Sequence, residues 1–95
     1  MNFKNLNKGQ FDLICGQLVK SRCGRDKDRI FIIKEILDDN YVLLIDGDLR
    51  KLEKPKLKKI KHINKINMAL IDYKNLNDSQ IRKAIKKYKE DSVNV

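Results

Sequence analysis

Residues 16–36, GQLVKSRCGRDKDRIFIIKEI, contain two apolar segments on either side of a short loop that is crowded with Gly, Lys and Arg. Leu18–Ser21 and the β-branched, aromatic run Ile30–Leu37 are typical of strands. The pattern therefore predicts a basic loop carried on a small β scaffold. Such a loop favours nucleic acid as a ligand, because clustered cations attract phosphate.

Further short segments of β type follow, each ended by turn residues. The predicted strands are Tyr41–Ile45, Leu49–Leu52 and Leu57–Ile63. The turn sequences are Asp38-Asp39-Asn40 and Asp46-Gly47, the latter because Gly tolerates a positive φ. Pro55 removes a backbone donor and favours a strand edge or break. Short strands joined by tight turns predict a mainly β fold, a small five-stranded barrel whose closure removes exposed edges.

The C-terminal part of the chain predicts a helix. Asn77 can cap it, with Gln80 three residues on. An apolar stripe at helical spacing follows: Ile81, Ala84, Ile85 and Tyr88. This stripe can pack on the barrel, while the helix's cations form a solvated face or meet phosphate, the solvated face being favoured. At 95 residues the chain is one domain, which divides into an extension at 1–13, a barrel at 14–63, a connecting segment at 64–76, a helix at 77–90 and a tail at 91–95.

The net charge of +9 is unevenly distributed. Arg50–Lys65 has eight cations and one anion, Lys20–Arg29 has five cations and two anions, and Arg82–Glu90 has five cations and one anion, whereas Lys34–Asp48 is acidic. Segregated positive charge attracts either nucleic acid or an anionic membrane. The chain has no apolar run of about eighteen residues and its N-terminus lacks the apolar core of a signal peptide. We therefore expect a cytoplasmic protein that does not bind membranes.

Neither metal binding nor catalysis has support in the sequence. Cys15 and Cys23 have a spacing that matches no zinc pattern, and we interpret them as reduced thiols. The only histidine, His62, cannot be assembled into a catalytic triad. The clustered aspartates at 38, 39, 46 and 48 are better explained by turn formation than by a divalent ion. We expect no enzyme activity, no cofactor and no small-molecule substrate.

The segment from Gly16 to Ile63 resembles the KOW motif. The most specific piece is Gly24-Arg25-Asp26-Lys27, in the loop that follows the alternating Leu18-Val19-Lys20, and the second is Asp46-Gly47 followed by basic residues. The chain looks like a single-KOW-domain RNA-binding protein of bacteria and is similar to the eukaryotic-type large-subunit ribosomal KOW proteins. It departs from many KOW loops at Asp28, which stands where they have Gly. Asp adopts left-handed conformations more easily than most residues, so the turn can form, and its carboxylate is expected to orient Arg25 or Arg29.

The resemblance implies an SH3-like barrel that binds structured RNA, usually ribosomal RNA in the ribosome, through the basic loop 20–29 and adjacent basic surface. From the residue chemistry, arginines are expected to make oriented contacts and lysines to contact phosphates without reading sequence. The arginine candidates are Arg22, Arg25, Arg29 and Arg50. The lysine candidates are Lys20, Lys27, Lys51, Lys54, Lys56, Lys58, Lys59 and Lys61.

The aromatic residues do not form the paired motif with which RNA-recognition sheets stack bases, which favours recognition of folded RNA by shape and backbone. The alternative is a protein-interaction module in transcription or translation, with the acidic edge Lys34–Asp48 as its contact surface. We expect a monomer when the protein is free, since a closed barrel leaves no sheet edge.

Overall fold

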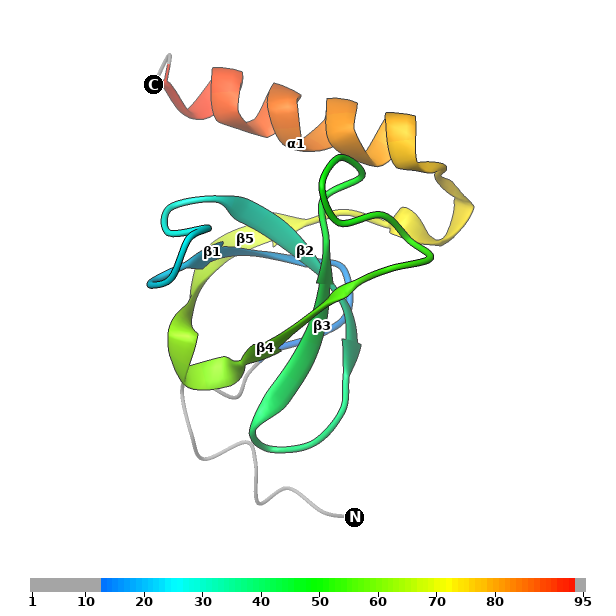
Figure 1. Ribbon diagram of the computed structural model, residues 1–95. Coiled ribbons are helices and arrows are strands. Elements are labelled where there is room, and N and C mark those ends of the chain that lie inside the picture. Colours follow the sequence, from blue (N-terminus) through cyan, green and yellow to red (C-terminus); the bar gives the residue numbers. More distant parts are fainter. Residues whose placement is uncertain (1–12, 94–95) are drawn as a thin grey trace.

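The computed structural model describes residues 13–93, apart from the side chains of residues 67–69, 92 and 93. The extension predicted for 1–13 lies outside the described residues except for Leu13. The described strands are β1 (Gln17–Ser21), β2 (Ile30–Ile36), β3 (Tyr41–Ile45), β4 (Lys56–Lys59) and β5 (Ile63–Leu70). They form one antiparallel sheet in the order β4-β3-β2-β1-β5. The sheet curls into a half-barrel, with the helix α1 (Asp78–Val93) lying across it (Figure 1). A mainly β fold with a C-terminal helix is thus confirmed.

The curled sheet is buried on both faces. Its concave face holds one apolar cluster, which includes Val19, Phe31, Ile33, Val42 and Leu44. The opposite face carries Leu18, Ile30, Ile32 and Ile45, which pack against Ile81 and Ile85 of α1. Successive side chains of a strand point to opposite faces, so a strand covered on both sides must be apolar at every position. This explains why the run from Ile30 to Ile33 does not alternate.

The helix begins as the sequence predicts. The Asn77 N–H donates to Gln80 Oε1 at 2.9 Å, and the Gln80 N–H donates to Asn77 Oδ1 at 2.8 Å. This reciprocal pair satisfies backbone donors that have no partner within the helix. Asp78 Oδ1 also accepts a hydrogen bond from the Leu52 N–H at 2.8 Å, which ties the first turn of α1 to the β3–β4 connection.

One predicted strand is wrong and another is correct only in part. Leu49–Leu52 forms no strand, because Asp46 Oδ1 accepts hydrogen bonds from the backbone N–H groups of Asp48 and Arg50 and bends the chain into a turn. The segment Leu57–Ile63 is not one strand either. It contains most of β4, then a 3₁₀ turn at Ile60–His62, and only then the first residue of β5.

The irregular connection predicted for 64–76 is also wrong over its first part, because β5 continues to Leu70. β5 pairs with β1 through an irregular register, in which Gln17 lies opposite Leu70 and Val19 lies opposite Lys65. A bulge of this kind adds residues on one strand and interrupts the period-two pattern by which a strand is detected. β4 and β5 are connected by the 3₁₀ turn, and no ladder between them occurs in the described sheet.

Candidate nucleic-acid interface

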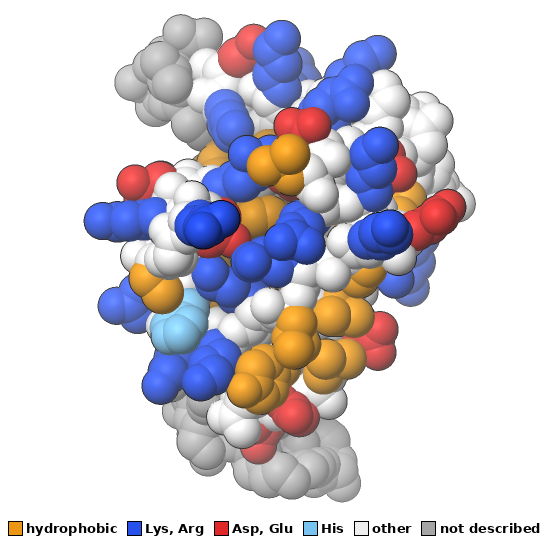
Figure 2. Space-filling model, in the orientation of Figure 1, with side chains coloured by type: hydrophobic (Ala, Val, Ile, Leu, Met, Phe, Trp, Pro, Cys, Tyr) orange, Lys and Arg blue, Asp and Glu red, His pale blue; other side chains and the backbone are white. Residues whose placement is uncertain are grey.

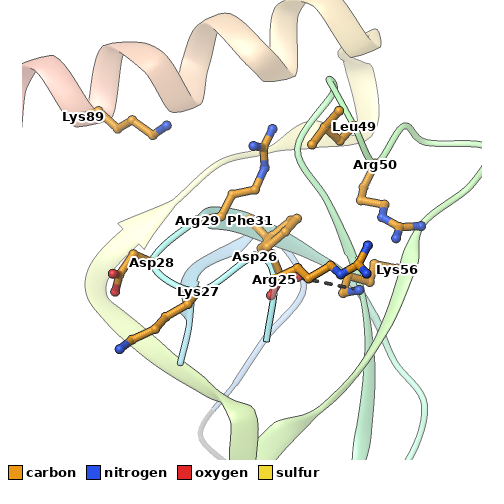
Figure 3. A pocket seen from close by; sticks show the side chains of 10 residues that line it. All are labelled: Arg25, Asp26, Lys27, Asp28, Arg29, Phe31, Leu49, Arg50, Lys56 and Lys89. Atoms are coloured by element: carbon orange, nitrogen blue, oxygen red, sulfur yellow. Dashed lines mark ion pairs between the residues drawn. The ribbon is translucent and has the colours of Figure 1, made fainter. Parts of the chain in front are cut away.

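The loop between β1 and β2 is held in a compact shape by its own backbone. The Asp28 N–H donates to the Ser21 carbonyl at 2.9 Å, and the Arg29 N–H donates to the Asp26 carbonyl at 2.9 Å. Asp28 has a φ of 71°, the left-handed conformation that its place in the loop predicts. Its carboxylate orients neither Arg25 nor Arg29, so that expectation is wrong. Figure 3 shows the Asp28 and Lys27 side chains pointing away from the loop.

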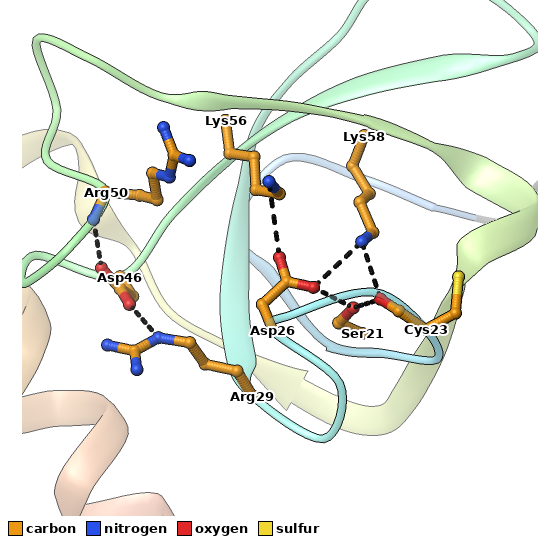
Figure 4. Close-up of polar contacts among 8 residues, drawn as sticks. All are labelled: Ser21, Cys23, Asp26, Arg29, Asp46, Arg50, Lys56 and Lys58. Carbon is orange, nitrogen blue, oxygen red and sulfur yellow. Dashed lines mark hydrogen bonds and ion pairs between the residues drawn. The ribbon is translucent and has the colours of Figure 1, made fainter.

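Asp26 attaches the loop to β4. Its Oδ1 accepts hydrogen bonds from Ser21 Oγ at 2.7 Å and from Lys58 Nζ at 3.0 Å, and Lys56 Nζ lies 3.7 Å from Oδ2 (Figure 4). Partial burial raises the pKa of Asp26, but the hydrogen bonds from Ser21 and Lys58 and the two lysine charges together lower it below its usual value. Asp26 is therefore ionised at neutral pH and holds two lysines in place.

Lys58 is a structural residue. Its side chain is only 10% exposed, and its Nζ donates both to Asp26 and to the Cys23 carbonyl at 3.1 Å. The sequence predicts that Lys58 contacts phosphate. The structure instead places its charge inside the fold, where a paired carboxylate compensates for the cost of burial.

Arg29 is held by a second carboxylate. Its Nε donates to Asp46 Oδ2 at 2.7 Å, and its Nη2 lies 3.3 Å from Asp48 Oδ2. Asp46 is buried, and its other oxygen accepts backbone hydrogen bonds from the turn that it bends (Figure 4). These contacts raise the pKa of Arg29 against the effect of desolvation. Asp46 thus joins the β1–β2 loop to the β3–β4 connection and fixes the direction of the Arg29 guanidinium.

The two loops and the helix surround a hollow of about 680 Å³, which we call the basic hollow. Five of the predicted RNA-binding residues line it: Arg25, Lys27, Arg29, Arg50 and Lys56. The others in its lining are Asp26, Asp28, Phe31, Leu49 and Lys89. The lining therefore contains six cations and two carboxylates, one of which is already engaged with lysines. Figure 2 shows Lys and Arg side chains gathered over the centre of this face of the molecule.

The other predicted residues lie elsewhere on the surface. Arg22 and Lys61 line a separate hollow of about 340 Å³ beside β5, where Arg22 Nη1 donates to the Lys61 carbonyl at 3.2 Å. The remaining candidates are all exposed and do not line the basic hollow: Lys20 on β1, Lys51 and Lys54 in the β3–β4 connection, and Lys59 on β4. The predicted site is thus divided into one concentrated group and several scattered cations.

The cations beside the second hollow affect the pKa of His62. Desolvation and the nearby charges of Lys61, Lys58, Lys59 and Arg22 lower the pKa of His62. Its imidazole is therefore mostly uncharged at neutral pH, and it adds no charge of its own to this group.

Five residues of the lining were not predicted as site residues, and two of them, Lys89 and Leu49, lie outside the β1–β2 loop and the sheet. Lys89 reaches the basic hollow from α1, and Leu49, 71% exposed, lies at its rim (Figure 3). The sequence did mark Lys89 as one of five cations on the helix. Which of them approaches the loop depends on how α1 is rotated over the sheet, and that rotation is set by Ile81 and Ile85.

The described part of the chain contains no group of three or more His, Cys, Asp or Glu side chains placed to hold a metal ion. Among the same residues, no helix has the length and apolar character needed to cross a bilayer. No protein-family model matches this chain, and no curated protein sequence matches it either.

Proposed function

We propose that this chain is a non-catalytic, cytoplasmic RNA-binding protein with an SH3-like barrel of the KOW type, and that it binds structured ribosomal RNA in the basic hollow. One observation carries the proposal. Cations from three segments that are far apart in sequence converge on one hollow, and its lining holds only two carboxylates. A concentrated cationic concavity raises the local concentration of a polyanion, and its lysines and arginines can replace condensed counterions at the phosphates.

The cations in the basic hollow differ in how tightly their side chains are held, which suits contacts with the phosphate backbone of an RNA. Arg29 is preoriented by Asp46, so binding would cost it little side-chain entropy. Arg25 and Arg50 make no side-chain hydrogen bond within the described residues, so their guanidinium groups are available for bidentate contacts with phosphate. Lys56 is held only loosely, 3.7 Å from Asp26, and can share its charge with a phosphate.

Base stacking has little support at this site. Phe31 is the one aromatic residue among the hollow's lining, and it is 1% exposed within the core. Single-stranded nucleic acid is usually bound on exposed aromatic side chains. A cationic hollow without such a platform favours contacts with the backbone of a folded RNA.

Titration of purified large-subunit ribosomal RNA at several salt concentrations tests the proposal. Log affinity should fall linearly with log salt, with a slope of about 0.7 to 0.9 for each phosphate contacted. The slope for the variant R25Q/R50Q should be smaller by about 1.5, because two phosphate contacts are removed. The control K74Q/K83Q removes the same charge from exposed positions outside the hollow and should leave the slope nearly unchanged.

A wild-type protein that binds this RNA with no salt dependence would overturn the proposal. Equal slopes for R25Q/R50Q and K74Q/K83Q would remove the basic hollow from the interface. Either variant can be checked for folding by circular dichroism, and neither substitution removes a side-chain hydrogen bond within the described residues.

A second candidate function, docking of a protein partner, is favoured by a different observation. Leu37, which follows the end of β2, and Leu57 of β4 are 45% and 56% exposed. The acidic edge, proposed from sequence as the contact surface, is less suitable. Asp46 is buried and Asp38 accepts the Asn40 and Tyr41 N–H groups in the turn between β2 and β3. Binding through the leucines would be weakly dependent on salt, which separates the two functions.

A further inference from the structure

The helix α1 presents two different rows of cations. Arg82, Lys86 and Lys89 follow one another at i, i+4 and i+7, so they lie along one side of the helix. Lys83 and Lys87 form a second row on another side, where Lys87 Nζ lies 4.0 Å from Asp91 Oδ2. From sequence, all five were expected to face solvent more readily than phosphate. The structure separates them into two rows with different surroundings.

The first row faces the β1–β2 loop across a hollow of about 210 Å³, which we call the helix-side hollow. Its lining consists of Arg29, Ile30, Asp46, Asp48, Arg82, Ile85, Lys86 and Lys89. Arg29 and Lys89 also line the basic hollow, so the two hollows adjoin at these residues. Figure 3 shows Lys89 extending from the helix above Arg29, whose guanidinium points toward α1. The two hollows therefore adjoin between α1 and the loop, and we call them together the furrow.

The charges of the first row are not neutralised inside the fold. The two carboxylates of the helix-side hollow, Asp46 and Asp48, are both engaged with Arg29. Within the described residues, α1 forms one ion pair, between Lys87 and Asp91, and no residue of the first row takes part in an ion pair. Three like charges on one helix side repel one another, and this repulsion would be relieved by an anion in the furrow.

The helix is also fixed firmly enough to act as a wall. Its N-terminus is capped by Asn77 and tied to Leu52 through Asp78, and Ile81 and Ile85 are buried against the sheet. From Arg82 to Lys89 the helix rises about 10 Å, so the three cations are spread along the length of the furrow and do not meet at one point. The spacing of the row thus suits a run of successive phosphates rather than one isolated anion.

We propose that Arg82, Lys86 and Lys89 form the second wall of a phosphate-binding furrow, in which one strand of the RNA backbone lies between α1 and the β1–β2 loop. This inference rests on the proposed function, because it assigns a further part of the same interface. It places α1 in direct contact with RNA, in addition to its role in covering the sheet.

Two double variants with equal charge test the inference. K86Q/K89Q removes two cations of the furrow, and K83Q/K87Q removes two cations from the other row of the same helix. Glutamine has a helix propensity close to that of lysine, so both helices should form equally well. Binding of purified large-subunit ribosomal RNA is measured over a series of salt concentrations. For K86Q/K89Q we expect the salt slope to fall by about 1.5 and affinity at physiological salt to fall roughly tenfold. K83Q/K87Q should retain nearly the wild-type slope.

A second measurement uses the wild-type protein and needs no variant to fold. Lysines are acetylated with and without the RNA, and the extent at each position is read by mass spectrometry. The RNA should protect Lys86 and Lys89 and leave Lys83 and Lys87 reactive. Equal protection of both rows, or equal slopes for the two variants, would overturn the inference while leaving the basic hollow intact. A wild-type slope near zero would instead overturn the proposed function itself.

Discussion

Replacement of Gly47 by alanine tests how closely α1 is packed on the sheet. Gly47 follows Asp46 in the turn after β3 and has a φ of 75°. A left-handed conformation costs an L-residue about 1–2 kcal/mol. A Cβ at this position would also collide with the Asp78 carbonyl oxygen and lie 2.8 Å from the Arg82 nitrogen. Both are backbone atoms of the first turns of α1, so a rotamer change cannot relieve the contact. Overpacking of this kind adds about 1–3 kcal/mol.

Gly24 provides the matched control. Its φ is 88°, so alanine carries the same conformational cost there. A Cβ on Gly24 would meet only the Lys58 ammonium at 3.6 Å and the Asp26 carboxylate at 3.7 Å, which are ordinary contacts. G24A should therefore destabilise the protein by about 1–2 kcal/mol, and G47A by about 2–5 kcal/mol once overpacking is included.

Urea unfolding followed by circular dichroism measures this difference. The m-value should stay constant across wild type, G24A and G47A, so that a shift in midpoint reports a change in stability. Hydrogen exchange should show weaker protection of α1 amides in G47A than in G24A, because the helix must move away from the turn. Equal losses of stability in the two variants would refute the close approach of α1 to Gly47.

A pH titration and five other substitutions test further contacts. The pKa of Asp26 is lower in the folded protein than in the unfolded chain, so the ionised carboxylate stabilises the fold. This stabilisation should be complete above about pH 4 and should be lost as the pH falls through the pKa of Asp26 in the folded protein. Urea midpoints measured down to about pH 2 should therefore fall less steeply in D26N than in wild type. K58M should destabilise the fold by about 2–4 kcal/mol, because it leaves the mostly buried Asp26 carboxylate without its closest cation. Equal urea midpoints for K58M and wild type would contradict this loss of stability. Y73F should cost about 1 kcal/mol by removing the 2.6 Å hydrogen bond from the Tyr73 hydroxyl to the Lys34 carbonyl, a loss that thermal unfolding can detect. N77A should cost about 1 kcal/mol through loss of the helix cap, and N77S should restore most of it.

The features that depend on neighbouring residues were predictable from sequence. β1, β2 and β3 lie within one residue of their predicted ends, since each is a short segment of β type that is stopped by turn residues. The cap of α1 was predictable for the same reason, because Asn77 and Gln80 are three residues apart. The left-handed conformation of Asp28 likewise reflects a preference of its own residue type.

The features that depend on tertiary contacts were not predictable in this way. Asp46 has the composition of a turn residue, and only the fold shows that its carboxylate also holds Arg29, seventeen positions away. Lys58 sits among exposed lysines in sequence, yet it is buried because β4 places it over Asp26. β5 escaped detection because its bulge against β1 interrupts alternation. The sequence therefore located the basic loop, while the division of its cations into structural and available groups required the structure.

Sedimentation of the endogenous protein through sucrose gradients tests the central claim most directly. Lysate is run at low and high salt, with nuclease-treated lysate alongside. The account predicts that the protein co-migrates with large subunits or whole ribosomes at low salt, and that high salt or nuclease releases it, because phosphate contacts weaken as salt competes for them. Migration at the top of the gradient at both salt concentrations would contradict the account.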